Sequence, residues 1–404
     1  MRNNQKIPEG WSVKKISDLG NVISGGTPDT NNPEYWDGDV LWVTPSEVSN
    51  LSNRFLYNTE RKITEKGLKE SSAKLLPINS LIICTRATIG DCCINKVPMC
   101  TNQGFKNIIV KNNNVDFLYY LIKKNKNELI RKACGSTFLE ISKKDIDNLK
   151  FAIPPLPEQE KIAGILGTWN EAIEKLSSLI EQKKLLKKGL MQRLLTGKTR
   201  LNGFTQPWKE VAIQDFCNIK RGGSPRPIEN YLTSSDDGLN WLKIGDISPD
   251  AKYIYKTESK IKKDGVSKTT LVHSDDFILS NSMSFGRPYI MKIDACIHDG
   301  WLALTSIKKD VSKEFLFYLL SFSETQKKFN MCAAGSGVRN LNKDIVGEVK
   351  IQLPPYYEQK AIADVLSTAD EEIDLLNKKL EALKEQKKGL MQQLLTGQTR
   401  VKVN

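Results

Sequence analysis

The stretch Lys187-Lys188-Gly189-Leu190-Met191-Gln192-Arg193-Leu194-Leu195-Thr196-Gly197-Lys198-Thr199-Arg200 returns 200 residues later as Lys387-Lys388-Gly389-Leu390-Met391-Gln392-Gln393-Leu394-Leu395-Thr396-Gly397-Gln398-Thr399-Arg400. Only positions 193/393 and 198/398 differ. Chance does not produce such a match, so the chain contains an internal duplication. A period of this length is far above the roughly 20–50 residues of solenoid repeats, so each copy is domain-sized.

The repeat continues upstream through short anchors. The matched segments are Trp11 with Trp208, Ser24–Pro28 with Arg221–Pro225, Trp42–Val48 with Trp241–Ile247, Asn102–Phe105 with His298–Trp301, and Gly135-Ser136 with Gly335-Ser336. Between these anchors the two copies diverge. We therefore expect a first variable domain (1–153), a central helical segment (154–200), a second variable domain (201–353) and a C-terminal helical segment (354–404). Two copies with one frame and different intervening residues are expected to do one job on two targets.

The near-constant segments predict long helices. Pro154, Pro155 and Pro157 stop any earlier helix, and Glu158 and Gln159 then open a new one with acidic character at its positive end. Apolar residues follow at spacings of three and four, which is a coiled-coil stripe interrupted at Lys183. Gly197 is the expected C-terminal cap. A helix of about 32 residues is about 48 Å long. We expect the two stripes to pair in antiparallel fashion, with the variable domains at opposite ends of a rod and related by a pseudo-twofold axis.

The variable domains predict a mixture of strands and short helices. Strand-like runs are Val40–Val43, Leu81–Cys84, Asn107–Val110, Leu242–Ile244 and Phe277–Leu279. Short helices are expected around Asp116–Lys132 and Lys313–Asn330. The expected fold class is therefore α+β, with two domains joined by two long antiparallel helices.

Composition narrows the chemistry. The 404 residues carry 60 Lys and Arg against 47 Asp and Glu, a net charge of +13 that favours a polyanionic partner. None of the eight cysteines forms a Cys-x-x-Cys pair, so a structural zinc site is not expected and the thiols are expected to be reduced core residues. His273 and His298 are the only histidines, which leaves little material for a histidine-based catalytic or metal site. With no apolar run of membrane-spanning length and no secretory signal pattern, we expect a cytoplasmic protein.

These residues resemble the specificity subunit of type I restriction–modification systems over essentially the whole chain. The segments that carry the resemblance are Pro8–Trp11, Ser24–Pro28, Thr101–Phe105, Ile153–Ala163 and the duplicated Leu-Leu-Thr-Gly ending, together with the 200-residue repeat.

The resemblance implies a mechanism in which the chain itself is not an enzyme. Each variable domain would be a target-recognition domain that reads one half of a split, asymmetric site in double-stranded DNA. The helices would set the length of the unread spacer and dock two methyltransferase (M) subunits, which bind S-adenosylmethionine and methylate adenine. Two restriction (R) subunits would add ATP- and Mg-dependent translocation and cleavage, and the sequence leaves their presence open. No cofactor or metal is expected in this chain.

Residues that contact DNA are expected in the loops at the anchors, because base and phosphate contacts need polar side chains and close backbone approach. Residues at the glycine turns are candidates because a glycine backbone can approach phosphate closely. The candidates are Ser24, Thr27, Thr44, Ser46, Arg86, Thr88, Ser136, Thr137, Arg221, Ser224, Arg226, Lys243, Asp246, Ser282, Ser284, Arg287, Ser336, Arg339 and Asn340. Gln103 and His298 are placed at equivalent positions and are expected to make structural hydrogen bonds. The matched tryptophans are expected in the core.

Three motifs could suggest catalysis, and each is incomplete. Gly197-Lys198-Thr199 lacks the earlier glycine of a phosphate-binding loop, and Leu353-Pro354-Pro355-Tyr356 lacks the polar first residue of amino-methyltransferases. Pro249-Asp250 with Glu258-Ser259-Lys260 fits a loose nuclease pattern that Pro28-Asp29 with Glu60-Arg61-Lys62 also nearly fits. The alternatives to a specificity subunit are a single-chain methyltransferase or nuclease, and a coiled-coil scaffold without DNA binding.

Overall fold

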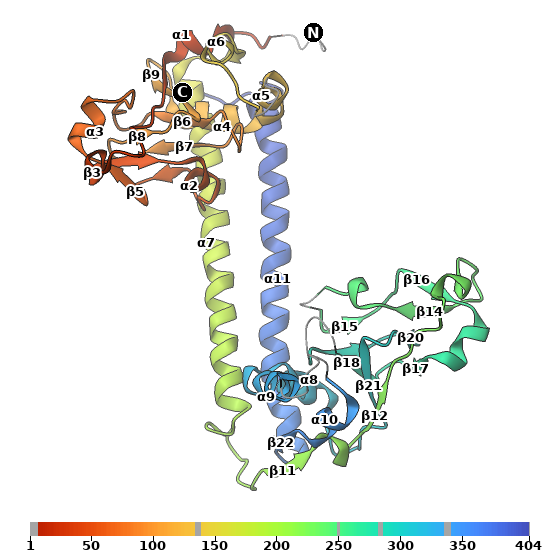
Figure 1. The fold of residues 1–404 in the computed structure, drawn as a ribbon. Helices are drawn as coiled ribbons and strands as arrows, with labels where there is room; N and C mark the ends of the chain where they lie inside the picture. The colour runs from red at the N-terminus through yellow and green to blue at the C-terminus, as the bar shows by residue number, and fades with distance from the viewer. Residues whose placement is uncertain (1–6, 134–138, 249–250, 282–285, 335–340, 404) are drawn as a thin grey trace. The chain divides into compact units, whose positions relative to one another are not determined.

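The computed structural model describes residues 7–133, 139–248, 251–281, 286–334 and 341–403. The chain forms two compact units, one of Met1–Leu179 with Leu376–Asn404 and one of Ile180–Leu375. The two longest helices, α7 (Leu156–Leu194) and α11 (Tyr356–Leu394), each contribute one part to each unit (Figure 1). The fold is α+β, and its internal repeat is visible in the strand order of the two domains.

The first domain is built on a five-stranded sheet of order β2-β9-β6-β7-β4, a three-stranded sheet of order β5-β3-β8 and the pair β1-β10. Its strands are β1 (Ser12–Lys15), β2 (Gly20–Ser24), β3 (Trp36–Val43), β4 (Phe55–Leu56), β5 (Arg61–Ile63), β6 (Leu81–Cys84), β7 (Cys92–Asn95), β8 (Cys100–Thr101), β9 (Phe105–Val110) and β10 (Lys150–Ile153). Its helices are α1 (Ile16–Leu19), η1 (Pro33–Tyr35), α2 (Pro45–Ser49), α3 (Glu65–Lys69), α4 (Val115–Lys124), α5 (Lys126–Lys132) and α6 (Lys143–Asp147).

The second domain repeats this topology. Its sheets have the orders β12-β21-β18-β19-β15, β13-β16-β14-β20-β17 and β11-β22. Its strands are β11 (Lys209–Ala212), β12 (Asn218–Arg221), β13 (Leu232–Thr233), β14 (Leu239–Leu242), β15 (Tyr253–Ile254), β16 (Ser259–Ile261), β17 (Thr270–Val272), β18 (Phe277–Ser280), β19 (Pro288–Met291), β20 (Ala295–Ile297), β21 (Trp301–Thr305) and β22 (Lys350–Leu353). Its helices are η2 (Ile213–Asp215), η3 (Ile228–Asn230), η4 (Ile244–Asp246), η5 (Lys263–Lys268), α8 (Lys313–Ser321), α9 (Ser323–Ala334) and α10 (Lys343–Glu348). The sheets β2-β9-β6-β7-β4 and β12-β21-β18-β19-β15 correspond, because each has three antiparallel pairings and one parallel pairing at the same edge.

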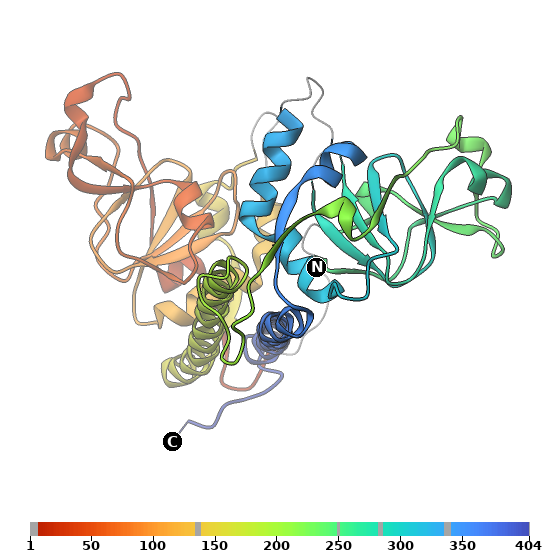
Figure 2. The same cartoon turned by 90° about the horizontal axis from the view of Figure 1, so that it is seen from below.

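Each domain shares its core with the long helices of its own unit. In the first unit, α4 lies against β7, and Ile162 and Leu166 of α7 join the same apolar cluster as Leu394 at the end of α11. In the second unit, α8 packs beside β19, as the rotated view of Figure 2 shows, and Ile362 and Leu366 join Leu194. The helix ends are therefore part of the domain cores.

The helix segments are antiparallel within each unit. In the first unit, Glu158 and Asn170 of α7 contact Arg400 and Lys387, so residue numbers rise along one helix as they fall along the other. In the second unit, Glu358 and Asp370 of α11 contact Arg200 and Lys187 in the same way. The predicted antiparallel pairing is confirmed at this level.

The helices are longer than the sequence pattern predicts. Each has 39 residues. In α7 the helix includes Pro157, which lies in the first turn, where a missing N–H breaks no helical hydrogen bond. Lys183, where the apolar stripe is interrupted, lies inside α7, and its ammonium pairs with Glu372 at 2.6 Å. Gly197 has φ +68, the left-handed conformation expected where a helix ends.

Most predicted strands and helices are confirmed, with two local corrections. The predicted strand at 242–244 is wrong beyond Leu242, because Ile244 begins the 3-10 turn η4. The two predicted short helices are each divided: Asn125 ends α4 and its side chain donates to Leu121 O at 2.8 Å, and extended Phe322 separates α8 from α9.

The cysteines that the structure describes are free, and all except Cys332 are buried. Burial raises the pKa of the Cys84, Cys92 and Cys217 thiols to about 12. Trp11, Trp42 and Trp241 are buried core residues as expected, whereas Trp208 is partly exposed. Over the described ranges, no helix combines the length and apolar character required to cross a membrane.

Candidate nucleic-acid interface

Three segments of the first domain meet around the turn between β8 and β9. In the turn after β2, Gly26 N donates to Thr101 O at 2.9 Å. In the turn between β8 and β9, Asn102 N donates to Val43 O, at the end of β3, at 3.1 Å. The loop after β6 donates from Thr85 N to Gly104 O at 2.7 Å. Three of the anchors that the repeat marks in sequence, Ser24–Pro28, Trp42–Val48 and Asn102–Phe105, are therefore brought together in space.

The second domain makes the same three bonds at equivalent places. Gly223 N donates to Ile297 O at 3.1 Å, His298 N to Leu242 O at 3.1 Å, and Asn281 N to Gly300 O at 2.9 Å. One backbone frame thus holds a cluster of loops in each domain, while the side chains presented by the loops differ.

The glycines of these turns allow neighbouring loops to pack closely together. A Cβ on Gly25 would lie 1.9 Å from Asn102 O, and one on Gly222 would lie 2.1 Å from His298 O. Their amides already donate to Phe105 O and Trp301 O. These glycine amides are therefore occupied within the loop cluster, and contact between this turn and phosphate stays a prediction that rests on the neighbouring side chains.

The side chains of the turn pair in a matched way. Thr27 donates through its hydroxyl to Gln103 Oε1, and Ser224 donates to Asp299 Oδ1 at 2.9 Å. The structural equivalent of Gln103 is therefore Asp299, and the equivalence with His298 is wrong by one residue. His298 makes a structural contact, since its Nδ1 accepts from Gly300 N at 2.9 Å.

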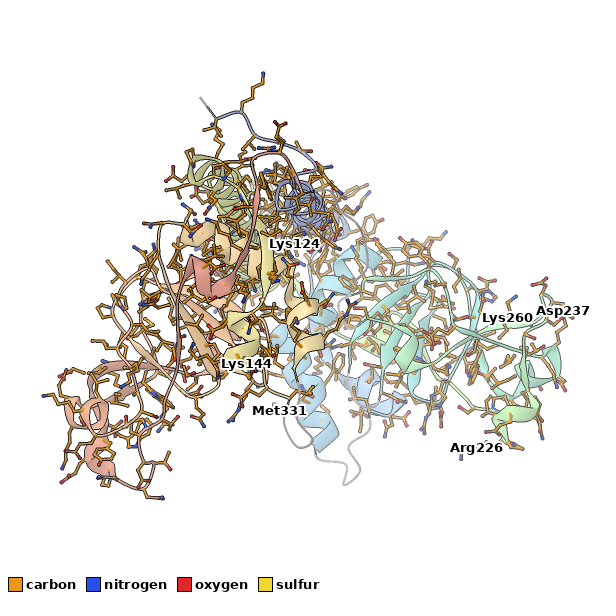
Figure 3. All side chains as sticks on the ribbon, turned by 90° about the horizontal axis from the view of Figure 1, so that it is seen from above. Lys124, Lys144, Arg226, Asp237, Lys260 and Met331 are labelled. Atoms are coloured by element: carbon orange, nitrogen blue, oxygen red, sulfur yellow. The ribbon has the colours of Figure 1, made fainter. Side chains whose placement is uncertain are left out.

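Two arginines of the second domain border this turn. Arg221 donates from Nε to Asp299 O at 3.4 Å, and Arg226 lies 3.8 Å from the Asp299 carboxylate. The Arg226 side chain is 82% exposed and is labelled at the edge of its domain in Figure 3. Because this side chain is exposed and its ion pair with Asp299 is long, it can turn toward a phosphate or a base without breaking a buried contact.

Arg86 occupies the loop after β6 in the first domain. Its guanidinium binds the Glu140 carboxylate through Nε at 2.8 Å and Nη2 at 2.6 Å, and Lys106 Nζ lies 3.2 Å from the other oxygen. Burial acts to raise the pKa of Glu140, but the hydrogen bonds from Arg86 and Lys106 outweigh it and lower that pKa. Glu140 was not predicted, because it lies 54 residues from Arg86 and no local motif marks it.

The segment after each matched tryptophan is a helix cap. Thr44 donates its hydroxyl to Glu47 Oε2 at 2.6 Å, and Lys243 N donates to Asp246 Oδ2 at 3.1 Å. The Asp246 side chain is only 2% exposed, so its role is to cap η4 and its assignment to the interface is corrected. Ser46 and Lys243 retain exposed surface and stay candidates.

Some of the remaining candidates lie in the part of the chain that the structure describes, and the others lie outside it. The hydroxyl oxygen of Thr88 is buried, which removes it from the interface in this conformation, and Arg287 is half-buried beside Ser280. Ser24 ends β2 and is half-buried. Candidates outside the described residues are Ser136, Thr137, Ser282, Ser284, Ser336, Arg339 and Asn340.

Residues of two of the motifs that could suggest catalysis have structural roles. A Cβ added at Gly197 would lie 3.5 Å from the Trp208 ring, and Leu353 is a buried residue at the end of β22. Among the residues described, no group of three or more His, Cys, Asp or Glu side chains is placed to hold a metal ion.

The fold and the loop clusters define a class of protein with two copies of one α+β domain, each presenting variable polar loops and each integrated with two long helices. The family model described as type I restriction modification DNA specificity domain matches residues 8–183 and 205–385. The chain belongs to this family, and it is a recognition component and not a catalytic one.

Individual relatives agree with this assignment. The MjaVIII specificity subunit of Methanocaldococcus jannaschii is 25% identical over 98% of this chain and 95% of its own length. The MjaIX specificity subunit of the same organism is 42% identical, over 42% of this chain and 40% of that relative. The crystal structure of an S subunit from M. genitalium has a TM-score of 0.59 at 17% identity and covers 98% of both chains, which shows the shared fold.

Proposed function

We propose that this chain is the specificity subunit of a type I restriction–modification complex and reads a bipartite, asymmetric site in double-stranded DNA. Residues 1–153 and 201–353 would be the two target-recognition domains, one for each half-site. The observation that carries the proposal is the pair of loop clusters, which share three backbone hydrogen bonds and present different side chains. A common frame with different polar groups suits two readers of different base sequences.

The helical segments 154–200 and 354–404 would dock two methyltransferase subunits. Leu185, Leu186 and Leu375 support this role, because these large apolar side chains are 57–68% exposed on the two long helices. Large apolar side chains that stay exposed on a helix can form part of a partner surface. S-adenosylmethionine, ATP and Mg would be bound by the partner subunits, and the complex would act in the cytoplasm, where the DNA is.

Replacing Arg86 by alanine should weaken or alter recognition of one half-site only. A good arginine contact to a base contributes about 1–3 kcal/mol of discrimination, so we expect roughly a 10- to 100-fold loss on the cognate half-site. The measurement is binding of the reconstituted methyltransferase complex to duplexes in which one half-site at a time is scrambled. Because Arg86 and Glu140 are both partly exposed, the change should cost little stability.

The matched variant is Arg226→Ala in the second domain, which should affect only the other half-site. A loss spread equally over both half-sites in either variant would contradict the assignment of one reader to each half.

A further inference from the structure

The first unit contains a pocket of about 890 Å³ between the first domain and the long helices of the same unit. Its walls come from the loop before β4, from α4, and from facing parts of α7 and α11. This volume lies within the roughly 300–1,000 Å³ typical of small-molecule sites. Six cationic and three acidic side chains line it, together with apolar groups such as Leu51, Tyr119 and Met391.

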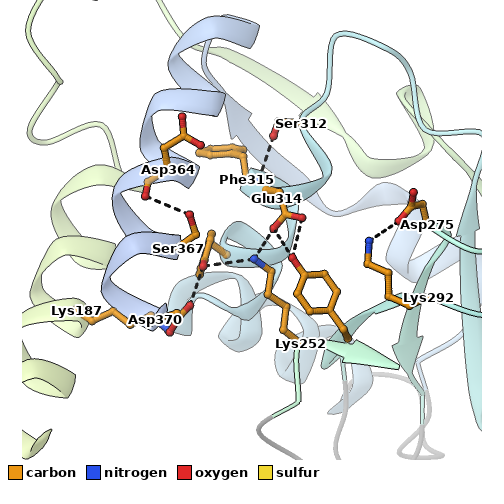
Figure 4. A network of polar contacts seen from close by, with 12 residues as sticks. Lys187, Lys252, Asp275, Lys292, Ser312, Glu314, Phe315, Asp364, Ser367 and Asp370 are labelled. Carbon is orange, nitrogen blue, oxygen red and sulfur yellow. Dashed lines mark hydrogen bonds and ion pairs between the residues drawn. The ribbon is translucent and has the colours of Figure 1, made fainter. Parts of the chain in front are cut away.

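The repeat supplies an internal comparison for the central lysine of this pocket. In the second unit, Lys187 pairs with the Asp370 carboxylate, and Tyr318 donates its hydroxyl to the other oxygen of Asp370 at 2.7 Å (Figure 4). The Lys187 ammonium also lies 5.5 Å from the centre of the Tyr318 ring. The equivalent lysine there is neutralised by a carboxylate.

The first unit keeps the same arrangement but lacks that carboxylate. Lys387 contacts Asn170 Oδ1, Asn170 donates from Nδ2 to the Tyr120 hydroxyl at 2.7 Å, and the Lys387 ammonium lies 5.6 Å from the Tyr120 ring. Asn170 stands where the second repeat has Asp370. The amide oxygen accepts a hydrogen bond but carries no charge that would neutralise the Lys387 ammonium.

Nearby side chains increase the positive charge. Lys123 and Lys124 of α4 also line the pocket, and Lys124 is labelled in Figure 3. Asp91 pairs with Lys123 at 3.7 Å and with Lys126 at 2.8 Å, and within the described part of the chain Lys124 has no carboxylate within ion-pair distance. Burial, followed by the charges of Lys123 and Arg54, lowers the pKa of Lys387, and Glu174 opposes this only in part. The ammonium groups therefore repel one another in the empty pocket.

We propose that this pocket binds a small organic phosphate, with Lys387, Lys123 and Lys124 around the phosphate group and the apolar wall against the organic part. A phosphate monoester carries close to two negative charges at neutral pH and accepts bonds from several ammonium groups at once. Leu51, Tyr119 and Met391 would contact the organic group. The site does not depend on DNA recognition and adds a ligand that the specificity role does not require.

The test is isothermal titration of the full chain with inorganic phosphate and with phenyl phosphate. We expect one site per chain and tighter binding of phenyl phosphate, because its ring adds apolar contact. Asn170→Asp should weaken both ligands at least tenfold, since it supplies the carboxylate that already neutralises Lys187 in the second unit. Because the second unit holds an Asp–Lys–Tyr set of this kind, the variant is expected to fold.

The matched control is Asp370→Asn, which makes the same exchange in reverse outside the pocket and should leave phosphate affinity unchanged. Absence of binding at phosphate concentrations up to about 10 mM, where even millimolar sites are detectable, would overturn the proposal. Equal effects of the two variants would overturn it too. If Asn170→Asp reduces duplex DNA binding as strongly as phosphate binding, the site is a contact to the DNA backbone and the small-molecule assignment fails.

Discussion

Replacing Glu158 by alanine should lower the free energy of unfolding by about 2–3 kcal/mol. The Glu158 side chain is 4% exposed, and its carboxylate accepts from Trp11 Nε1 at 3.1 Å and from Arg400 Nε and Nη2 at 2.8 and 2.9 Å. Removing it leaves a buried indole donor without a partner and releases the C-terminal segment from the start of α7. Losing one member of a buried, hydrogen-bonded group costs more than the net strength of the bonds themselves. The measurement is the urea midpoint of the unfolding transition.

The chain provides two matched variants for this prediction. Glu160→Ala changes an exposed glutamate on the same turn of α7 and should have little effect. Glu358→Ala removes the equivalent carboxylate in the second unit, where Arg200 and Trp208 are the donors, and should destabilise the protein in the same way. A Glu158→Ala protein as stable as Glu160→Ala would show that the contact between the C-terminal segment and α7 contributes nothing.

Lengthening both helices by four residues should lengthen the unread spacer by about two base pairs and leave both half-sites unchanged. The insertions belong after Ser178 in α7 and after Leu375 in α11, next to the boundaries between the two compact units, so that contacts within each unit are kept. Four residues add about 6 Å of helix, and DNA rises about 3.4 Å per base pair. The measurement is selection of methylated sites from a library with randomised spacers.

A second insertion of equal length separates the effect of a longer helix from the effect of a disrupted one. Four alanines favour the helix, whereas an insertion of the same length containing two glycines weakens it. The alanine insertion should give one new, longer spacer, and the glycine-containing insertion should give weak or mixed selection. New half-sites with an unchanged spacer would contradict the proposal that the helices set the spacing.

The sequence predicts the repeated frame well because its signals are local or duplicated. Apolar periodicity marks α7 and α11, and short β-rich runs mark β6, β9 and β18. The duplication itself identifies the anchors, and the structure brings three of them into one loop cluster in each domain.

Contacts between distant residues are what the sequence does not predict. Glu158 and Arg400 are 242 residues apart, and nothing near either residue indicates that one binds the other. The glycine turns show a different limit: glycine permits close approach, but the sequence does not say whether phosphate or the neighbouring loop will approach. Asp246 is a similar case: its polar side chain is typical of a binding residue, but the sequence does not show that this side chain is buried as a helix cap.

The difference between Asn170 and Asp370 is visible in the alignment of the two halves, yet its meaning depends on the lysine opposite each residue. Lys187 and Lys387 belong to the best-matched stretch of the repeat, so they suggest identical environments. Only the packed structure shows that one is neutralised by a carboxylate and the other lines a pocket.

The most direct test of the central claim is a genome-wide map of N6-methyladenine in host cells with and without this gene. We predict that deletion removes methylation from one split motif, with two defined half-sites and an unread spacer, and that Arg86→Ala and Arg226→Ala each change one of those half-sites. An unchanged map, or the loss of a continuous motif, would contradict the assignment of this chain as a reader of a bipartite site.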